Sequence, residues 1–314
     1  MYMNSRRATT ATTPSGASIE YELVDNKPNA PAVVFVSGLG NHRTMWARQR
    51  ERFSHEHSML FVDNRGVGES SSPSGLWSVA DHANDVLSVM SKVVPHWSTR
   101  PVHLVGHSMG GFICYEISRR AAEFRIASLT LISCPLFSSA LTLRPSGLFG
   151  MVSMLCAPDA KSLLEAAMDL NYPSDWREKR AFDGLSGTND DAATRFLMAN
   201  LRGRRQIAPS TWFKQVWAYG SYVAPPPIDR DKSTPAVRSL VIGGDEDSLV
   251  RLSNLKKAAE KLSAECVILE GGGHNVFVQM AVEVNAALER HWRGHEAVSP
   301  PSPPVRAGEA DALL

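Results

Sequence analysis

Apolar, strand-like runs alternate with helix-like segments along most of this chain, and the alternation limits the folds open to it. Strand-like apolar runs at 32–36, 59–62 and 126–132 are separated by segments with apolar residues at helical spacing, such as 79–94. Strands that alternate with helices build a largely parallel sheet covered on both faces. The sequence therefore predicts an α/β fold with a doubly covered, mostly parallel sheet.

The alternation stops for roughly a hundred residues and then resumes. Residues 136–231 contain helix-like segments instead, and the strand and helix pattern returns at about residue 236. A stretch of this kind is typical of a helical insertion between two halves of one sheet. We therefore expect a core of residues 18–135 and 232–294, with an inserted helical cap at residues 136–231.

The two ends of the chain have a different composition from the rest. Residues 1–17 are rich in Thr, Ser and Ala and lack an apolar core for a secretory signal, and residues 295–314 are rich in proline. We expect both segments to be disordered. A cytoplasmic location is favoured. The alternative is a mitochondrial transit peptide, because residues 1–17 contain Arg6 and Arg7 but no acidic residue.

Charge and cysteine usage exclude several function classes. The 314 residues carry 33 basic and 32 acidic side chains, a net charge of +1, so no nucleic-acid or acidic-membrane partner is implied. The longest apolar stretch, 136–156, is broken by Arg144 and Pro145, so stable membrane insertion is not expected. The four cysteines are scattered without metal-ligand spacing, and the sequence predicts neither a metal nor a cofactor.

A G-x-S-x-G pentapeptide marks a candidate nucleophile. Gly106-His107-Ser108-Met109-Gly110 lies between a buried strand at 101–105 and a helix at 112–122. Glycines permit a strained turn that lifts Ser108 out of the sheet edge, with its Oγ toward a pocket. The amide of Met109, at the helix N-terminus, and that of Leu39, in a tight loop, are candidate donors for a tetrahedral oxyanion.

A serine nucleophile needs a base and a group that orients the base. His274 follows the last predicted strand in Gly271-Gly272-Gly273-His274, at the sheet edge of Ser108, and His42 is its rival. The segment Gly243-Gly244-Asp245-Glu246-Asp247 follows another strand, and its three carboxylates are all candidates for the orienting acid. From the residues alone, each acid can equally be a residue at the N-terminus of the next helix, where a negative charge is stabilising.

Together these motifs resemble the α/β-hydrolase superfamily. The resemblance spans most of the chain: Ser37-Gly38-Leu39-Gly40, Asp63 to Ser70, the segment around Ser108, Gly244 to Val250, and Gly273-His274. It implies the α/β-hydrolase fold, with Ser108 as nucleophile, Asp247 as acid, His274 as base, and Leu39 and Met109 as oxyanion donors. One departure is Ser37, where the family usually has histidine, and it leaves the support of the oxyanion loop open.

The expected function is that of a serine hydrolase acting on a small, apolar acyl substrate, an ester, thioester or related bond, through an acyl-enzyme. Serine at position 108 argues against dehalogenase or epoxide hydrolase chemistry, which needs an aspartate. Carbon–carbon bond hydrolysis, aminopeptidase action and non-catalytic ligand binding stay open as alternatives. Side chains expected to line the substrate pocket are His42, Met151, Leu155, Trp212, Phe213 and Trp217, although apolar residues at helical spacing also suit the core of the cap.

Overall fold

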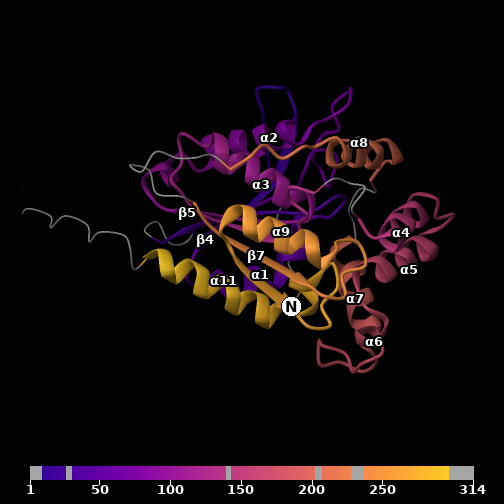
Figure 1. Cartoon of the computed structure of the whole chain (residues 1–314). Coiled ribbons are helices and arrows are strands. Elements are labelled where there is room, and N and C mark those ends of the chain that lie inside the picture. The colour runs from indigo at the N-terminus through magenta and orange to yellow at the C-terminus, as the bar shows by residue number, and fades with distance from the viewer. Residues whose placement is uncertain (1–8, 26–29, 139–142, 202–206, 228–236, 297–314) are drawn as a thin grey trace, which may run out of the picture.

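A single mixed sheet forms the centre of the molecule in the computed structural model, which describes residues 9–25, 30–138, 143–201, 207–227 and 237–296 (Figure 1). Within these residues the strand order is β1-β2-β4-β3-β5-β6-β7-β8. β1 and β2 run antiparallel to their neighbours, and the other pairs are parallel. The strands are β1 (Thr9–Thr12), β2 (Ser18–Val24), β3 (Ala32–Val36), β4 (Ser58–Val62), β5 (Val102–His107), β6 (Ile126–Ile132), β7 (Arg238–Gly244) and β8 (Glu265–Leu269).

Helices cover both faces of the sheet, as predicted (Figure 1). Side chains of β3 alternate between the faces: Val34 and Val36 join one core cluster, whereas Val33 and Phe35 join the other. The first cluster includes α2 (Val79–Val93), α3 (Met109–Arg120) and α9 (Leu252–Leu262). The second includes η1 (Arg43–Trp46), α1 (Ala47–Phe53), α10 (Val276–Gln279) and α11 (Ala281–Glu296). A further short helix, η2 (Pro95–Thr99), precedes β5.

The two halves of the sheet join across the helical insertion. β6 and β7 pair in parallel although they are separated by residues 133–237 in the sequence. Between them lie α4 (Pro145–Leu155), α5 (Ala160–Asn171), α6 (Ser174–Arg177), α7 (Asn189–Leu201) and α8 (Pro209–Gly220), gathered at one end of the sheet in Figure 1. The bounds of a separate cap stay a prediction, but its helical content is as expected.

Helix α4 was missed at the sequence level because Pro145 and Arg144 interrupt its apolar run. Pro145 occupies the first turn of α4, where its missing N–H group removes no intrahelical hydrogen bond. A proline therefore begins this helix rather than breaking it. Among the helices in the described part of the chain, none is long and apolar enough to cross a bilayer.

Residues 9–12 correct the prediction of a disordered segment over residues 1–17. They form β1, which pairs with β2 from Thr9 opposite Tyr21 to Thr12 opposite Ser18. The edge of β2 offers unpaired backbone groups, and these can order a polar segment that has little apolar surface of its own. Residues 1–8 and 297–314 lie outside the described residues.

Candidate active site

Ser108 occupies a strained turn between β5 and α3. Its φ of 52° and ψ of −120° fall in a region that side chains other than glycine rarely adopt. Its N–H group donates to the carbonyl oxygen of Ile132 at 2.8 Å, which ties the turn to β6. The Ser108 residue is 6% exposed. The turn therefore holds a serine at the carboxyl edge of the sheet in a conformation that costs of order 1–3 kcal/mol.

Close backbone contacts explain the glycines around Ser108. A Cβ atom at Gly106 would collide with the carbonyl oxygen of Gly110, and one at Gly110 would collide with the carbonyl oxygen of Val36. The start of α3 can therefore pack directly against β3 and β5. Met109 is the first residue of α3, and the first amides of a helix have no partner within the helix. The amide of Met109 is thus suited to receive an anion next to Ser108.

Asp247 and His274 are in direct contact. Asp247 Oδ2 and His274 Nδ1 lie 2.8 Å apart, and the two residues are 0% and 5% exposed. Asp247 Oδ1 accepts two more hydrogen bonds, from the N–H groups of Leu249 at 2.8 Å and Val250 at 2.9 Å. Because an ionised carboxylate only accepts hydrogen bonds, Nδ1 of His274 carries the proton and Nε2 is left as a proton acceptor.

The other two carboxylates of the same loop have different surroundings. Asp245 Oδ1 accepts from the N–H group of Gly271 at 2.8 Å, so it supports the loop before His274. Glu246 is exposed. Of the three acids that the sequence left open, the geometry brings Asp247 to the imidazole of His274.

His107 links the strand of Ser108 to the loop of His274, a contact that the sequence analysis did not identify. Its Nε2–H group donates to the carbonyl oxygen of His274 at 3.1 Å, and its ring centroid lies 4.9 Å from that of His274 and 4.7 Å from that of Phe277. Burial, together with the charge of His274, holds the pKa of His107 well below its usual value. A neutral His107 immediately before Ser108 therefore ties together the two loops that carry the candidate nucleophile and base.

Ser37 is integrated into the loop after β3. Its Oγ accepts from Trp46 Nε1 at 3.0 Å, and its carbonyl oxygen accepts from Asn64 Nδ2 at 2.8 Å. The next residue, Gly38, lies against the nucleophile turn, because a Cβ atom there would come within 3.1 Å of Ser108 Cβ. The hydroxyl of Ser37 thus anchors the loop that contains Gly38 and Leu39.

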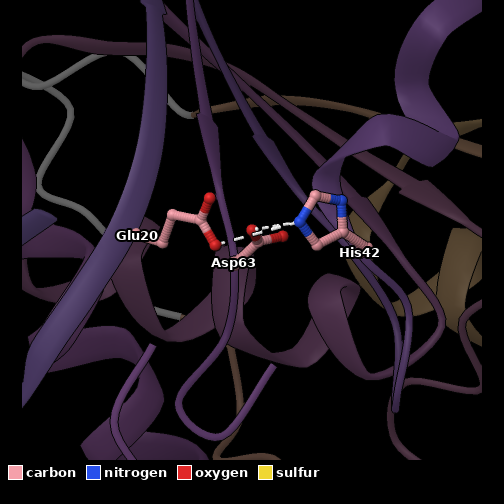
Figure 2. A group of neighbouring side chains, drawn as sticks. All are labelled: Glu20, His42 and Asp63. Carbon is pink, nitrogen blue, oxygen red and sulfur yellow. Dashed lines mark ion pairs between the residues drawn. The ribbon is translucent and has the colours of Figure 1, made fainter. Parts of the chain in front are cut away.

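The far end of this loop is anchored in a buried charged cluster of Glu20, His42, Arg43 and Asp63, three of which are drawn in Figure 2. His42 Nε2 lies 2.8 Å from Asp63 Oδ2 and 3.9 Å from Glu20 Oε2. Arg43 Nη1 lies 2.7 Å from Glu20 Oε1 and also pairs with Asp63. Burial alone would lower the pKa of His42, but the carboxylates of Asp63 and Glu20 raise it overall.

This cluster changes the interpretation of His42. The side chain was expected to line the substrate pocket, but it is 5% exposed and both ring nitrogens have partners, Asp63 at Nε2 and Thr44 at Nδ1. Ligand atoms of Glu20, His42 and Asp63 lie within 4.8 Å of one another, as a metal site would need. The guanidinium of Arg43 already pairs with both carboxylates, so a cation would have to displace it.

The remaining expected pocket residues divide between two environments. Trp212 packs over the loop after β3, since a Cβ atom at Gly40 would come within 2.7 Å of its indole ring, and Met151 packs partly buried against the core. Phe213, Trp217 and Leu155 are 59%, 48% and 49% exposed. These last three are exposed on α8 and α4, and their place in a substrate pocket stays a prediction.

A cavity of about 300 Å³ lies where the insertion meets the loops of Asp247 and His274. Its lining combines polar side chains, such as Asn171, Arg177 and Glu246, with apolar surface from Leu170 and Pro173. Two hydrogen bonds join the insertion to the core beside this cavity. Ser248 Oγ donates to the carbonyl oxygen of Leu170 at 2.6 Å, and the N–H group of Asn275 donates to the carbonyl oxygen of Asn171 at 3.2 Å. The helical insertion therefore contacts both loops that carry the acid and the histidine.

Comparisons with known proteins agree with this architecture. Residues 33–287 match the model of the alpha/beta hydrolase family. A Rhizobium rhizogenes protein named "Putative carbamate hydrolase RutD" is 25% identical over 87% of this chain and 97% of its own length. The enol-lactonase from Burkholderia xenovorans superposes with a TM-score of 0.71 at 19% identity, over 91% of this chain and all of that one. The esterase RhEst1 from a Rhodococcus species superposes with a TM-score of 0.70 at 18% identity, over 92% and 99%.

Proposed function

This chain belongs to the alpha/beta hydrolase family, and from that premise we propose that it cleaves an acyl bond of a small molecule through a covalent intermediate on Ser108. The single observation that carries the proposal is the buried contact of 2.8 Å between Asp247 and His274, at the sheet edge where Ser108 occupies its strained turn. A buried carboxylate bonded to a histidine, at the sheet edge that also carries a serine, is the arrangement that serine acyl transfer requires.

In the proposed reaction, Ser108 Oγ attacks the carbonyl carbon of the substrate and its proton passes to Nε2 of His274. The imidazolium that forms is stabilised by Asp247, whose carboxylate already accepts from Nδ1. The negative charge on the carbonyl oxygen is received by the amides of Leu39 and Met109. His274 then returns the proton to the leaving group as the acyl–oxygen or acyl–sulfur bond breaks.

The second half of the reaction restores Ser108. Water attacks the acyl-enzyme, His274 accepts one of its protons, and the tetrahedral intermediate collapses to a carboxylic acid as the proton returns to Ser108 Oγ. Every proton transfer uses the same nitrogen of His274, since Nδ1 is engaged by Asp247. The name of the Rhizobium relative adds carbamates to the esters and thioesters that we propose as substrates.

Replacement of Ser108 by alanine tests the proposal. We expect Ser108→Ala to abolish covalent labelling by a fluorophosphonate probe and to reduce hydrolysis of p-nitrophenyl acetate and butyrate to background, because the attacking oxygen is gone. Ser133→Ala is a matched control: Ser133 also follows a parallel strand, β6, and also has a positive φ of 48°. The control should keep labelling and turnover.

Labelling of Ser108→Ala at the rate of the native protein would contradict the proposal. The rival role is binding without turnover, and the native protein itself distinguishes the two. A protein that binds these esters in a thermal-shift assay but neither hydrolyses them nor reacts with the probe would be a ligand-binding member of the fold.

A further inference from the structure

Gln215 on α8 connects the helical insertion to two loops of the core. Its side chain is fully buried at 0% exposure. Oε1 accepts from the N–H group of Gly40 at 2.8 Å, and Nε2 donates to the carbonyl oxygen of Arg65 at 3.1 Å. A buried amide without partners would cost free energy, and here both ends of the amide are used. One side chain of the insertion thus holds the loop after β3 against the loop after β4.

The bond to Gly40 acts on the peptide unit directly after Leu39, the residue proposed to receive the oxyanion. The preceding peptide unit, which contains the N–H group of Leu39, is held by its carbonyl: Gly38 O accepts from the N–H group of Asn41 at 3.2 Å. Because a trans peptide directs its N–H group opposite to its carbonyl, this bond sets the direction of the Leu39 N–H group. The two peptide units on either side of Leu39 are therefore held by different partners, one within the loop and one in α8.

The remaining contacts of this loop come from the core and from the neighbouring tryptophan. Ser37 is bonded to Trp46, and Arg43 is paired with Glu20 and Asp63, so the two ends of the loop are anchored independently of α8. The indole of Trp212 covers Gly40 by packing alone. Removal of the Gln215 amide should therefore leave the loop folded but allow the Leu39–Gly40 peptide to rotate.

We propose that Gln215 is a positioning residue for catalysis: by holding the Leu39–Gly40 peptide it fixes the turn from Gly38 to Asn41, and this turn sets the direction of the Leu39 N–H group toward the oxyanion. The inference rests on the proposed function, since it presupposes an oxyanion beside Ser108. It assigns the helical insertion a share in the chemical step in addition to contact with the substrate. Loss of the side chain should accordingly affect the transition state more than the bound substrate.

The test compares Gln215→Met with the native enzyme on p-nitrophenyl butyrate. Methionine keeps the length of the side chain and removes both hydrogen bonds. We expect kcat to fall about 10- to 100-fold, somewhat less than for complete loss of an oxyanion donor, and KM to change by less than about threefold. The concentration of active enzyme is taken from endpoint labelling with the fluorophosphonate, so that a misfolded fraction does not enter kcat.

Lys214→Met is the matched control on the same helix. Lys214 Nζ donates to the carbonyl oxygen of Pro73 at 2.7 Å, so this variant removes a bond between α8 and the core that does not involve the oxyanion loop. Its kcat should stay within about threefold of the native value. An unchanged kcat in Gln215→Met, or an equal fall in both variants, would overturn the inference, because the latter indicates a general loosening of the insertion.

Gln215→Glu supplies a second variant and a rescue. A protonated glutamic acid can accept from Gly40 and donate to the carbonyl of Arg65, whereas the ionised form cannot donate. The ratio of its kcat to the native kcat should therefore rise as the pH is lowered, and a ratio independent of pH would contradict the inference. Ser108→Ala separates the two proposals: if it stays active, the proposed function fails, and if it is inactive while Gln215→Met is fully active, only the role of Gln215 fails.

Discussion

Substitution of Asp247 by asparagine separates the orientation of His274 from the folding of its loop. In the native protein Asp247 Oδ1 accepts from the N–H groups of Leu249 and Val250, and Oδ2 accepts from His274 Nδ1. Two backbone donors face one oxygen, so the oxygen of asparagine will stay on that side and its NH2 group will face His274. The imidazole must then accept at Nδ1 and carry its proton on Nε2.

That tautomer cannot take the proton of Ser108, and the size of the defect follows from this. The equivalent change in a serine protease lowers kcat about 10⁴-fold, which corresponds to about 5.5 kcal/mol in the activation free energy. Stability should change far less, because the two backbone bonds of Asp247 remain and only the charge assistance is lost. We expect the free energy of unfolding to change by less than about 2 kcal/mol. Asp247→Ala, by contrast, leaves three buried donors without an acceptor, and each should lower the free energy of unfolding by about 1–3 kcal/mol.

The assay is single-substrate turnover of p-nitrophenyl butyrate together with urea unfolding followed by fluorescence. Asp245→Asn is the control, since Asp245 belongs to the same loop but accepts from the backbone of Gly271 rather than from His274. Its kcat should stay within a few-fold of the native value. A loss of less than tenfold in Asp247→Asn, or an equal loss in Asp245→Asn, would refute the reasoning.

Three further predictions concern stability. Both ring nitrogens of His82 are buried without a hydrogen-bond partner, and burial lowers its pKa to about 3. Because only the unfolded chain gains a proton there as the pH falls below about 6.5, the free energy of unfolding should decrease by about 2 kcal/mol at pH 5. In urea titrations, the free energy of unfolding of His82→Leu should decrease less between pH 7.5 and pH 5 than that of the native protein. Arg43→Met leaves the buried carboxylates of Glu20 and Asp63 without their guanidinium, and unfolding by urea should show a loss of about 3–5 kcal/mol, whereas a change below 1 kcal/mol would mean that the cluster is solvated. Gly110→Ala pushes a methyl group into the backbone of β3, and should reduce both the midpoint of thermal unfolding and the rate of fluorophosphonate labelling; a variant with native labelling would show that α3 can move away.

Local patterns were sufficient for the parallel strands of the sheet and for the order of the motifs along the chain. β3 and β6 were predicted at the residues where they occur, since a β-branched run between turn residues depends on few distant contacts. Glycine spacing around Ser108 likewise reflects a steric requirement within a few residues. The contact of Asp247 with His274 was expected from the resemblance to the α/β-hydrolase superfamily and is present in the structure, although their catalytic roles stay a proposal.

Side-chain partners at long sequence separation could not be derived in this way. The helical spacing of Trp212, Phe213 and Trp217 indicated a helix of the cap, but not that Gln215 would be buried against Gly40 while Phe213 faces solvent. His42 was similarly predicted to line a pocket, whereas the fold places it beside the carboxylate of Glu20. Such partners depend on how two surfaces meet, and the free energy of burying a polar group is decided by the atom opposite it.

The sequence by itself thus determined most of the elements, their order along the chain, and which residue types follow the strands of the sheet, because these follow from local periodicity and turn sterics. Only the tertiary structure decided which polar groups face one another there. It joined His107 to His274, Gln215 to the loop of Leu39, and Arg43 to its two carboxylates, since hydrogen-bond partners are selected by packing rather than by distance along the chain.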